Sequence, residues 1–363
     1  MYGLKLGVNM GYNINERLSN LIFIELKDLK ILDKISPYLY KELQGKDVLF
    51  PVDLKLITDK NNPKSSELTM DKFFVGMLLC IGGNENFIYN NYYEEIILNF
   101  DNSQEFYKGY IYSLIQKDEL FEAYIMLKGL CKIYFNDEYK EKLIVVLINL
   151  KDKDEFFNSE LKFHIDDAIK NYRTFNKVYL YKAMIERDEG NYVLALESIG
   201  KYKDQDEKGV KEFKEHLMSC KNYQDGKEKI YSSPKEALEK LIPLIDMFKN
   251  DALIYYYIAV AHRKLNMHQQ AIYYLENSRR IDSDIVEVVN ELGLNYAALG
   301  MYSHAIRYFE KVFKVTNSIE SCTNMIMSYL KLNDMENVKK YFEIARGINK
   351  NDEILKELEK LIL

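Results

Sequence analysis

An alanine followed four residues later by a bulky apolar side chain recurs along this chain of 363 residues at a spacing of 34. The three copies are Ala237 with Leu241, Ala271 with Leu275, and Ala305 with Phe309. A period of this length is typical of helix hairpins that stack on one another, because two short helices cannot bury their apolar faces alone. We therefore expect a stack of hairpins with a concave surface along one side.

A low content of helix breakers agrees with this prediction. The chain has only 5 prolines and 16 glycines, as expected where most residues lie in helices joined by short turns. Hydrophobic residues make up 47% and charged residues 29%, which is enough apolar surface for a folded protein. The fold class that we predict is all-α, an α-solenoid of antiparallel helix hairpins, with a little β structure as an option near the N-terminus.

Charge and cysteine usage restrict the partners. Fifty basic residues against 56 acidic ones give a net charge of −6, so neither nucleic acid nor an anionic membrane is an expected partner. The four cysteines are scattered and never form a C-x-x-C pair, which argues against a zinc site or a disulfide framework. No signal peptide is evident, and the longest nearly apolar run, residues 73–83, is too short to span a bilayer. We expect a cytoplasmic protein, and the abundance of Lys, Asn, Ile and Tyr suggests a bacterial, AT-rich genome.

The hairpin pattern is clearest from residue 252 onward. Apolar residues at helical spacing predict helices over 252–266, 270–281, 286–299 and 302–315. Gly300 is expected to end the third of these helices. A further copy, one residue shorter, begins at Ile319. The last segment places Leu355, Leu358 and Ile362 on one stripe, as a terminal helix that covers the last hairpin requires.

Within this pattern, one unit carries a recognisable set of residues: Leu292, Gly293, Tyr296, Ala305, Phe309 and Val312. On these residues the segment 286–319 resembles the tetratricopeptide repeat (TPR) family. Two positions depart from the family pattern, since Val289 replaces its opening tryptophan and Asn317 its late proline. The resemblance implies a right-handed superhelix in which small residues let paired helices approach and aromatic residues fill the space between hairpins.

Upstream the pattern weakens. Residues 176–209 repeat the spacing, but Ala195 and Ala237 are 42 residues apart, so an insertion is expected, most simply at the polar stretch 221–229. Further paired helices are predicted over 104–116, 119–134, 137–150 and 154–172. The predicted domains are an N-terminal cap or small separate domain (1–102), degenerate hairpins (103–175), TPR-like repeats (176–351) and a C-terminal capping helix (352–363).

The first hundred residues are the least regular. Helices are predicted over 71–81 and 89–100, and a loop over 59–67. The run PVDLKLIT at 51–58 fits a short strand or the start of a helix. Residues 15–32 and 35–43 fit two helices, but LIFIEL at 21–26 fits a strand equally well.

Motifs for catalysis or cofactors are not recognisable. Gly82-Gly83 lacks the further glycines and the lysine of a phosphate-binding loop, and we expect it to end a helix. His164, Asp166 and Asp167 do not converge at helical spacing, so no metal site is expected there and the two aspartates should remain solvated. His262 stands at the aromatic position of its hairpin and is expected to pack. No nucleophile motif occurs, so we predict a non-enzyme without catalytic, cofactor-binding or metal-binding residues.

The positive candidate is the concave face, which in the family is lined by the first helix of each repeat. The resemblance places nine groove residues there: Tyr256, Val260, Arg263, Lys264, Glu287, Asn290, Leu294, Thr323 and Met327. The lysine and asparagine of the family's carboxylate clamp are not matched, since Tyr256 and Val260 stand in their places. Arg263, Lys264 and Asn290 nevertheless offer donors and acceptors to an extended peptide. The alternative is that these residues line a solvated groove or pack against the chain's own N-terminal region.

The leading hypothesis is a non-catalytic module that binds a protein or peptide in this groove, with another copy of the chain as an optional partner. The alternative is a peptide-responsive cytoplasmic regulator with output through the N-terminal region; the acidic balance weakens a DNA-binding version. A third hypothesis places an enzyme site within the first hundred residues.

Overall fold

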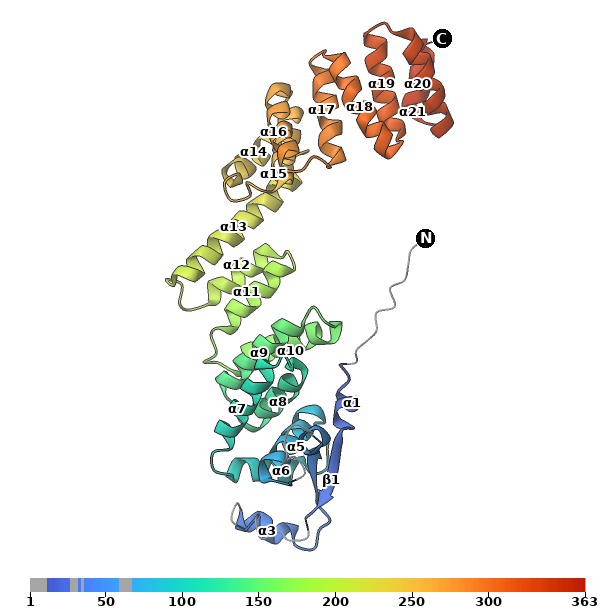
Figure 1. The fold of residues 1–363 in the computed structure, drawn as a ribbon. Coiled ribbons are helices and arrows are strands. Elements are labelled where there is room, and N and C mark those ends of the chain that lie inside the picture. Colours follow the sequence, from blue (N-terminus) through green and yellow to red (C-terminus); the bar gives the residue numbers. More distant parts are fainter. Residues whose placement is uncertain (1–11, 27–31, 34–35, 59–66, 363) are drawn as a thin grey trace. The chain divides into compact units, whose positions relative to one another are not determined.

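The computed structural model describes residues 12–26, 32–33, 36–58 and 67–362. Its contacts divide the chain into two compact units, which comprise residues 1–185 with 197–203 and residues 186–196 with 204–363. The described residues are mainly helical, with one two-stranded sheet near the N-terminus (Figure 1). The fold is therefore an all-α arrangement of helix hairpins with a small β region, as predicted.

The first unit begins with alternating short elements. These are α1 (Ile14–Leu18), β1 (Leu21–Glu25), α3 (Pro37–Leu43), β2 (Leu49–Asp53) and α4 (Leu54–Ile57). The strands pair antiparallel, with Leu21 opposite Asp53 and Glu25 opposite Leu49. LIFIEL therefore forms a strand and not a helix, and PVDLKLIT is divided between the end of β2 and α4. The loop predicted over 59–67 lies, except for its last residue, outside the described residues.

Longer helices complete the first unit. They are α5 (Met70–Gly83), α6 (Asn90–Asn99), α7 (Ser103–Gln116), α8 (Leu120–Ile133), α9 (Asp137–Leu150) and α10 (Glu155–Asn171). Side chains cap the first turns of the last two, since Asn136 accepts backbone N–H bonds at the start of α9 and Asp154 accepts one at the start of α10. Helices α11 (Val178–Asp188) and α12 (Tyr192–Lys201) each contain residues of both units.

Helix α5 lies at the centre of the first unit. Side chains are buried around most of its circumference, because it packs against α1, β2, α6 and α8. Glycines allow two of these approaches: a Cβ at Gly82 would lie 1.9 Å from the carbonyl oxygen of Ile125, and one at Gly76 would lie 2.2 Å from that of Pro51. Gly82 lies near the end of its helix, and the close approach of α8 also requires a residue without a side chain there. The core around α5 continues from Leu21 to Ile185, so the first hundred residues share it with α7 to α10.

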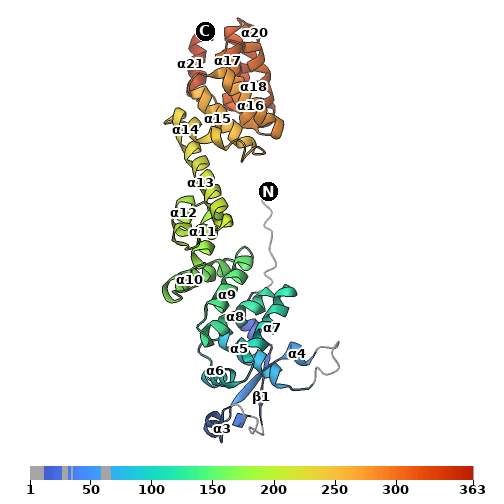
Figure 2. The ribbon, with the colours of Figure 1, turned by 90° about the vertical axis from the view of Figure 1, so that its left-hand side faces the viewer.

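The second unit is a series of hairpins. Its helices are α13 (Lys208–Lys229), α14 (Pro234–Leu241), α15 (Ala252–Lys264), α16 (His268–Ile281), α17 (Val286–Ala298), α18 (Tyr302–Thr316), α19 (Ile319–Lys331), α20 (Met335–Ile348) and α21 (Glu353–Ile362), with a 3-10 turn η1 (Ile242–Leu244). Consecutive α-helices from α13 to α20 contact one another, and the last hairpins lie side by side (Figure 2).

The repeated small residues lie where paired helices meet. Ala237, Ala271 and Ala305, the three alanines of the 34-residue period, have no exposed surface, and neither has Ala345 in α20. A Cβ at Gly293 of α17 would lie 2.5 Å from the ring of Phe309. The sequence period thus marks the close contacts of the hairpins.

The turns between paired helices use left-handed residues. Gly300 has φ +75° and its N–H donates to the carbonyl of Ala297, so it ends α17 as predicted. Asn266 (φ 59°) and Asn333 (φ 57°) occupy the equivalent places after α15 and α19. Asparagine tolerates this conformation better than other residues with a Cβ, which explains why these turns are preserved without glycine.

The insertion before Ala237 does not form a loop. Residues 221–229 are the end of α13, a helix of 22 residues. The stretch is polar because much of α13 is exposed, with only Val210, Leu217 and Gly226 buried. The extra residues therefore lengthen one helix.

The C-terminal helix α21 contacts α19 and α20. Leu355 and Leu358 are buried in the same cluster as Cys322 and Phe342. The side chain of Ile362 lies outside the described residues. None of the described helices has the length and apolarity that crossing a bilayer requires.

Packing at Gly82 generates a stability prediction. Gly82→Ala places a methyl group against the backbone of α8 and should lower the free energy of unfolding by about 3 kcal/mol, at the upper end of overpacking effects. Gly109→Ala in α7 is the matched control, because nothing lies within 4 Å of its Cβ position and alanine favours helix. Urea titrations followed by circular dichroism measure both. Equal stability of the two variants would contradict the assigned close approach.

Candidate functional site

The nine predicted groove residues lie on α15, α17 and α19, the first helices of three hairpins. Two of them are buried: Val260 is 1% exposed and Thr323 is 2% exposed. Val260 packs with Ile230 and Ala237, and the Thr323 hydroxyl donates to the carbonyl oxygen of Glu320 at 2.9 Å. Their side chains are therefore covered by the protein itself. The other seven define what we call the A-helix face: Tyr256, Arg263, Lys264, Glu287, Asn290, Leu294 and Met327.

Arg263 already has a carboxylate partner. Its Nε donates to Oε2 of Glu291 at 2.5 Å and its Nη2 to Oε1 at 2.9 Å, a bidentate pair between α15 and α17. Glu291 is buried, whereas Arg263 is partly exposed. Such a pair fixes the guanidinium plane. A ligand carboxylate would have to compete with Glu291 for the same donors, so Arg263 acts first as a link between neighbouring hairpins.

Lys264 and Tyr256 lie in the same part of the face. The Lys264 ammonium is 4.6 Å from the centre of the Tyr231 ring, and the Tyr231 side chain is 70% exposed. Burial, together with the nearby carboxylates of Glu291 and Glu287, raises the pKa of Tyr256 to about 12. Tyr256 is thus a neutral hydroxyl, and an exposed cation on an aromatic ring stands beside it.

The remaining members differ in their accessibility. Asn290 is partly exposed, and its amide makes no hydrogen bond to any residue that the structure describes. Glu287 and Met327 are exposed, Met327 to 50%. Leu294 is partly buried against the cluster that contains Cys322. The face therefore combines one free amide, opposite charges and apolar surface.

Sequence reasoning missed two neighbours of this face. Glu291 directly follows Asn290 on α17, but its side chain turns to Arg263. The groove positions implied by the family resemblance do not include Glu291, and they did not reveal it as a partner of Arg263 in the preceding first helix. Tyr231 lies before α14, outside the repeat positions that were considered, and no sequence pattern connects it to Lys264.

His262 packs as predicted. It is 6% exposed, and its ring stacks on Tyr274 of α16 with centroids 5.3 Å apart and planes inclined by 10°. Neither ring nitrogen has a hydrogen-bond partner among the described residues. Burial lowers the pKa of His262, so the neutral imidazole is the form that the hairpin accommodates.

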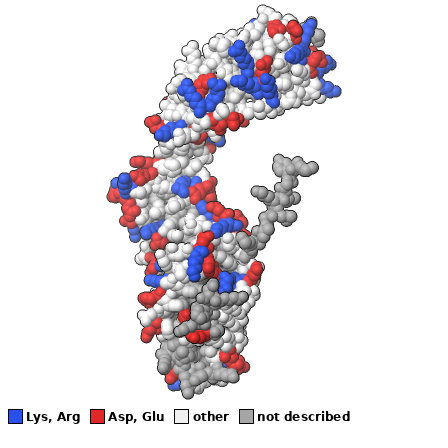
Figure 3. Space-filling model, in the orientation of Figure 1, with Lys and Arg blue, Asp and Glu red and all other residues white. Residues whose placement is uncertain are grey.

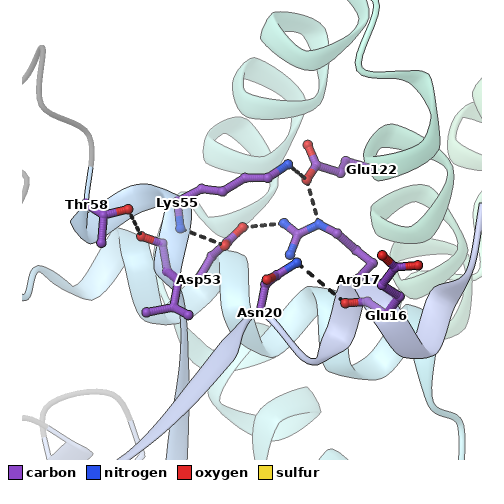
Figure 4. A network of polar contacts seen from close by, with 8 residues as sticks. Glu16, Arg17, Asn20, Asp53, Lys55, Thr58 and Glu122 are labelled. Atoms are coloured by element: carbon purple, nitrogen blue, oxygen red, sulfur yellow. Dashed lines mark hydrogen bonds and ion pairs between the residues drawn. The ribbon is translucent and has the colours of Figure 1, made fainter. Parts of the chain in front are cut away.

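The first unit contains a buried network of charges, which Figure 4 shows from close by. Arg17 of α1 pairs with Asp53 at the end of β2, and its Nε donates to Oε1 of Glu122 in α8 at 2.5 Å. The Lys55 ammonium donates to the same Glu122 oxygen at 2.6 Å. Although burial opposes ionisation, hydrogen bonds from Glu119 and Lys55 and the charge of Arg17 lower the pKa of Glu122 to about 2.

This network links three elements that are distant in sequence. Each buried charge in it faces an opposite charge, which offsets the cost of removing it from water. Three of its four residues, Arg17, Asp53 and Lys55, lie within the first hundred residues, where the hypothesised enzyme site was placed. A cavity of about 240 Å³ adjoins it, with Tyr12, Phe121 and Lys153 among the lining residues. We interpret the paired charges as a structural connection between the β-hairpin and α8.

A second buried group includes His164. Lys140 of α9 is 1% exposed, and its ammonium lies 2.8 Å from His164 Nδ1 and 2.6 Å from Asp167 Oδ2. Burial lowers the pKa of His164, so the neutral ring accepts from Lys140. The prediction that Asp167 stays in water is therefore wrong, because it compensates a buried lysine from the neighbouring helix; Asp166 is exposed.

Comparisons with known proteins give structural neighbours only. No family model matches the chain, and no curated protein matches it. Among solved structures, the chain is similar to MamA, with 20% identity, a TM-score of 0.36 and coverage of 47% of this chain and 90% of that one. It is also similar to YrrB, described as a TPR protein with an unusual peptide-binding site, with 17% identity, a TM-score of 0.41 and coverage of 54% and 97%.

A third similar structure is TTC0263, described as a thermophilic TPR protein in Thermus thermophilus. Identity is 16%, the TM-score is 0.33, and coverage is 52% of this chain and 100% of that one. YrrB and TTC0263 are both described as TPR proteins, the family that residues 286–319 resemble.

The Glu122 network generates a prediction about acid stability. The pKa of Glu122 lies below the ordinary value of 4.5, so its contribution to stability is fully present above that pH and is lost as the pH falls from about 4.5 towards 2. Glu122→Gln should lower the free energy of unfolding by roughly 3 kcal/mol at pH 7, because Arg17 loses a buried partner. The difference from wild type should shrink below pH 4.

Urea titrations between pH 7 and pH 3 measure this effect. Glu16→Gln is the control, since Glu16 is an exposed residue of the same region, on α1. A deficit of the Glu122 variant that stays constant across the pH range would contradict the assigned ion pairs.

Proposed function

We propose that this protein is a non-catalytic binding module that holds an extended segment of a partner protein on the A-helix face. The observation that carries the proposal is the unbonded amide of Asn290, which is partly exposed between the polar residues of α15 and the apolar Met327 of α19. An asparagine side chain can donate to a peptide carbonyl and accept from a peptide N–H at once, whatever the peptide sequence.

The neighbouring groups support the same function. Lys264 offers a cation to an acidic side chain, and Tyr231 beside it presents an exposed aromatic surface. Met327 adds a flexible apolar contact of the kind found on adaptable binding surfaces. The Arg263–Glu291 pair connects α15 and α17 before any ligand arrives, which reduces the ordering that binding requires.

The test uses the full chain and a random peptide library displayed on phage. Peptides enriched on wild-type protein are synthesised, and their affinities are measured by fluorescence polarisation. Asn290→Ala and Lys264→Ala should each weaken binding about fivefold to tenfold, the effect of one or two lost hydrogen bonds at an accessible site. Lys249→Ala, at an exposed position between α14 and α15, is the matched control and should bind as wild type does. Enriched peptides that bind all variants equally would contradict the proposal.

A second candidate is the peptide-responsive regulator, and the division into two compact units favours it. In such a protein, binding to the second unit changes the first. Hydrogen exchange of residues 36–58 and 67–100 with and without an enriched peptide measures this: slower or faster exchange in these segments supports regulation. Unchanged hydrogen exchange in these segments, with protection confined to α15, α17 and α19, supports a simple binding module and contradicts the regulator.

A further inference from the structure

Charge is distributed unequally over the hairpins of the second unit. The second helices α16, α18 and α20 carry most of the exposed cations, and we define their basic face by six residues: Arg280, Arg307, Lys311, Lys314, Lys339 and Lys340. Figure 3 shows basic side chains gathered over this part of the unit. The first helices α15, α17 and α19 contain as many acidic as basic residues. One side of the hairpins is therefore positive within a chain whose net charge is −6.

These cations are free to meet a partner. None of the six forms an ion pair with a described residue; Lys311 and Lys340 instead lie over the rings of Tyr308 and Tyr341. The same helices also carry four acidic residues, Glu310, Glu336, Glu343 and Glu276, against eight basic ones. Glu276 is engaged within the protein. It bonds to Arg279 at 2.7 Å and accepts from Tyr308 at 3.4 Å. Burying the basic face against acidic groups would thus satisfy charges that the protein itself leaves unpaired.

An apolar cavity adjoins this face between α17 and α18. It has a volume of about 370 Å³ and is lined mainly by Val286, Val289, Val312 and Val315, and also by Ser283, Asp284 and Lys311. The Asp284 carboxylate accepts a hydrogen bond from the Ser283 hydroxyl at 3.0 Å. Val315 is 72% exposed. The volume is within the range of ligand-binding pockets and accommodates a leucine or phenylalanine side chain.

We propose that the basic face binds an acidic segment of a partner protein that inserts one bulky apolar side chain into the valine cavity. The cations supply the charge complementarity, and the cavity next to Lys311 supplies a specific anchor. A nucleic acid satisfies only the first requirement, because its phosphate backbone does not fill an apolar cavity. The net negative charge of the chain also disfavours a long polyanion. This surface shares no residue with the A-helix face, although α17 contributes residues to both.

The test measures binding of a short fluorescein-labelled peptide of alternating Glu and Ser with one central Phe to the full chain. Two control peptides replace every Glu by Gln, or the Phe by Ser, and each should bind about tenfold more weakly or worse. Affinity should also fall as salt is added. Weak or absent binding, beyond about 1 mM, or equal binding of the three peptides would overturn the proposal.

Protein variants locate the site. Lys311→Glu with Lys314→Glu should reduce affinity at least tenfold, whereas Lys235→Glu with Lys249→Glu makes the same charge change at exposed positions elsewhere in the unit and should have a small effect. Val289→Trp fills the cavity and should reduce affinity about tenfold. If the tryptophan variant does not fold, Val315→Ser replaces it in the test, because Val315 is an exposed residue of the cavity lining, and this variant should also reduce affinity.

Competing probes decide the class of partner. A double-stranded DNA oligonucleotide and vesicles containing phosphatidylserine are measured under the same conditions. Tighter binding of either probe than of the peptide, or loss of peptide affinity in the Lys235/Lys249 variant equal to that in the Lys311/Lys314 variant, would identify a general polyanion surface and overturn the proposal.

Discussion

Close approach of paired helices at small residues is the constraint on which the second unit depends. Ala237, Ala271 and Ala305 are fully buried at successive contacts, and Gly293 lets Phe309 reach the backbone of α17. A larger side chain at these places would separate the helices and open cavities between them. The same device acts in the first unit, where Gly82 receives the backbone of α8. Helix spacing, and with it the position of every surface residue, follows from these few contacts.

With the helices fixed at this distance, the exposed surface of each hairpin has two sides that differ in charge. One side is formed by the first helix and the other by the second helix. The first helices use much of their charge within the protein, since Glu291 takes both donors of Arg263. The lysines of the second helices are exposed to solvent, so their ammonium groups stay hydrated and remain accessible to a partner. Buried charges are treated differently: Arg17, Glu122 and Lys140 each have an opposite or accepting partner nearby, because an unpaired charge in the interior is expensive.

Candidate residues could be located on the correct helices from the sequence, but their accessibility could not. The resemblance to the TPR family placed nine groove residues on α15, α17 and α19, yet Val260 and Thr323 are buried and Arg263 is held by Glu291. A position in a repeat fixes the direction of a side chain relative to its own helix. Whether a neighbour such as Ile230 or Glu291 covers it depends on residues that follow no period. Tyr231 illustrates the same point, because it approaches Lys264 from outside the repeats.

The sequence by itself determined the hairpins from residue 252 onward, since their order depends on local apolar spacing, on turn residues such as Gly300, and on small residues repeated every 34 positions. Only the tertiary structure decided the strand at 21–25, where a run such as LIFIE suits helix and strand alike until Asp53 and its neighbours pair with it. It also decided that the insertion lengthens α13 and that α17 and α18 leave a cavity lined by valines. Local preference selects a helix, whereas contacts between segments distant in sequence select a strand, an ion pair or an open space.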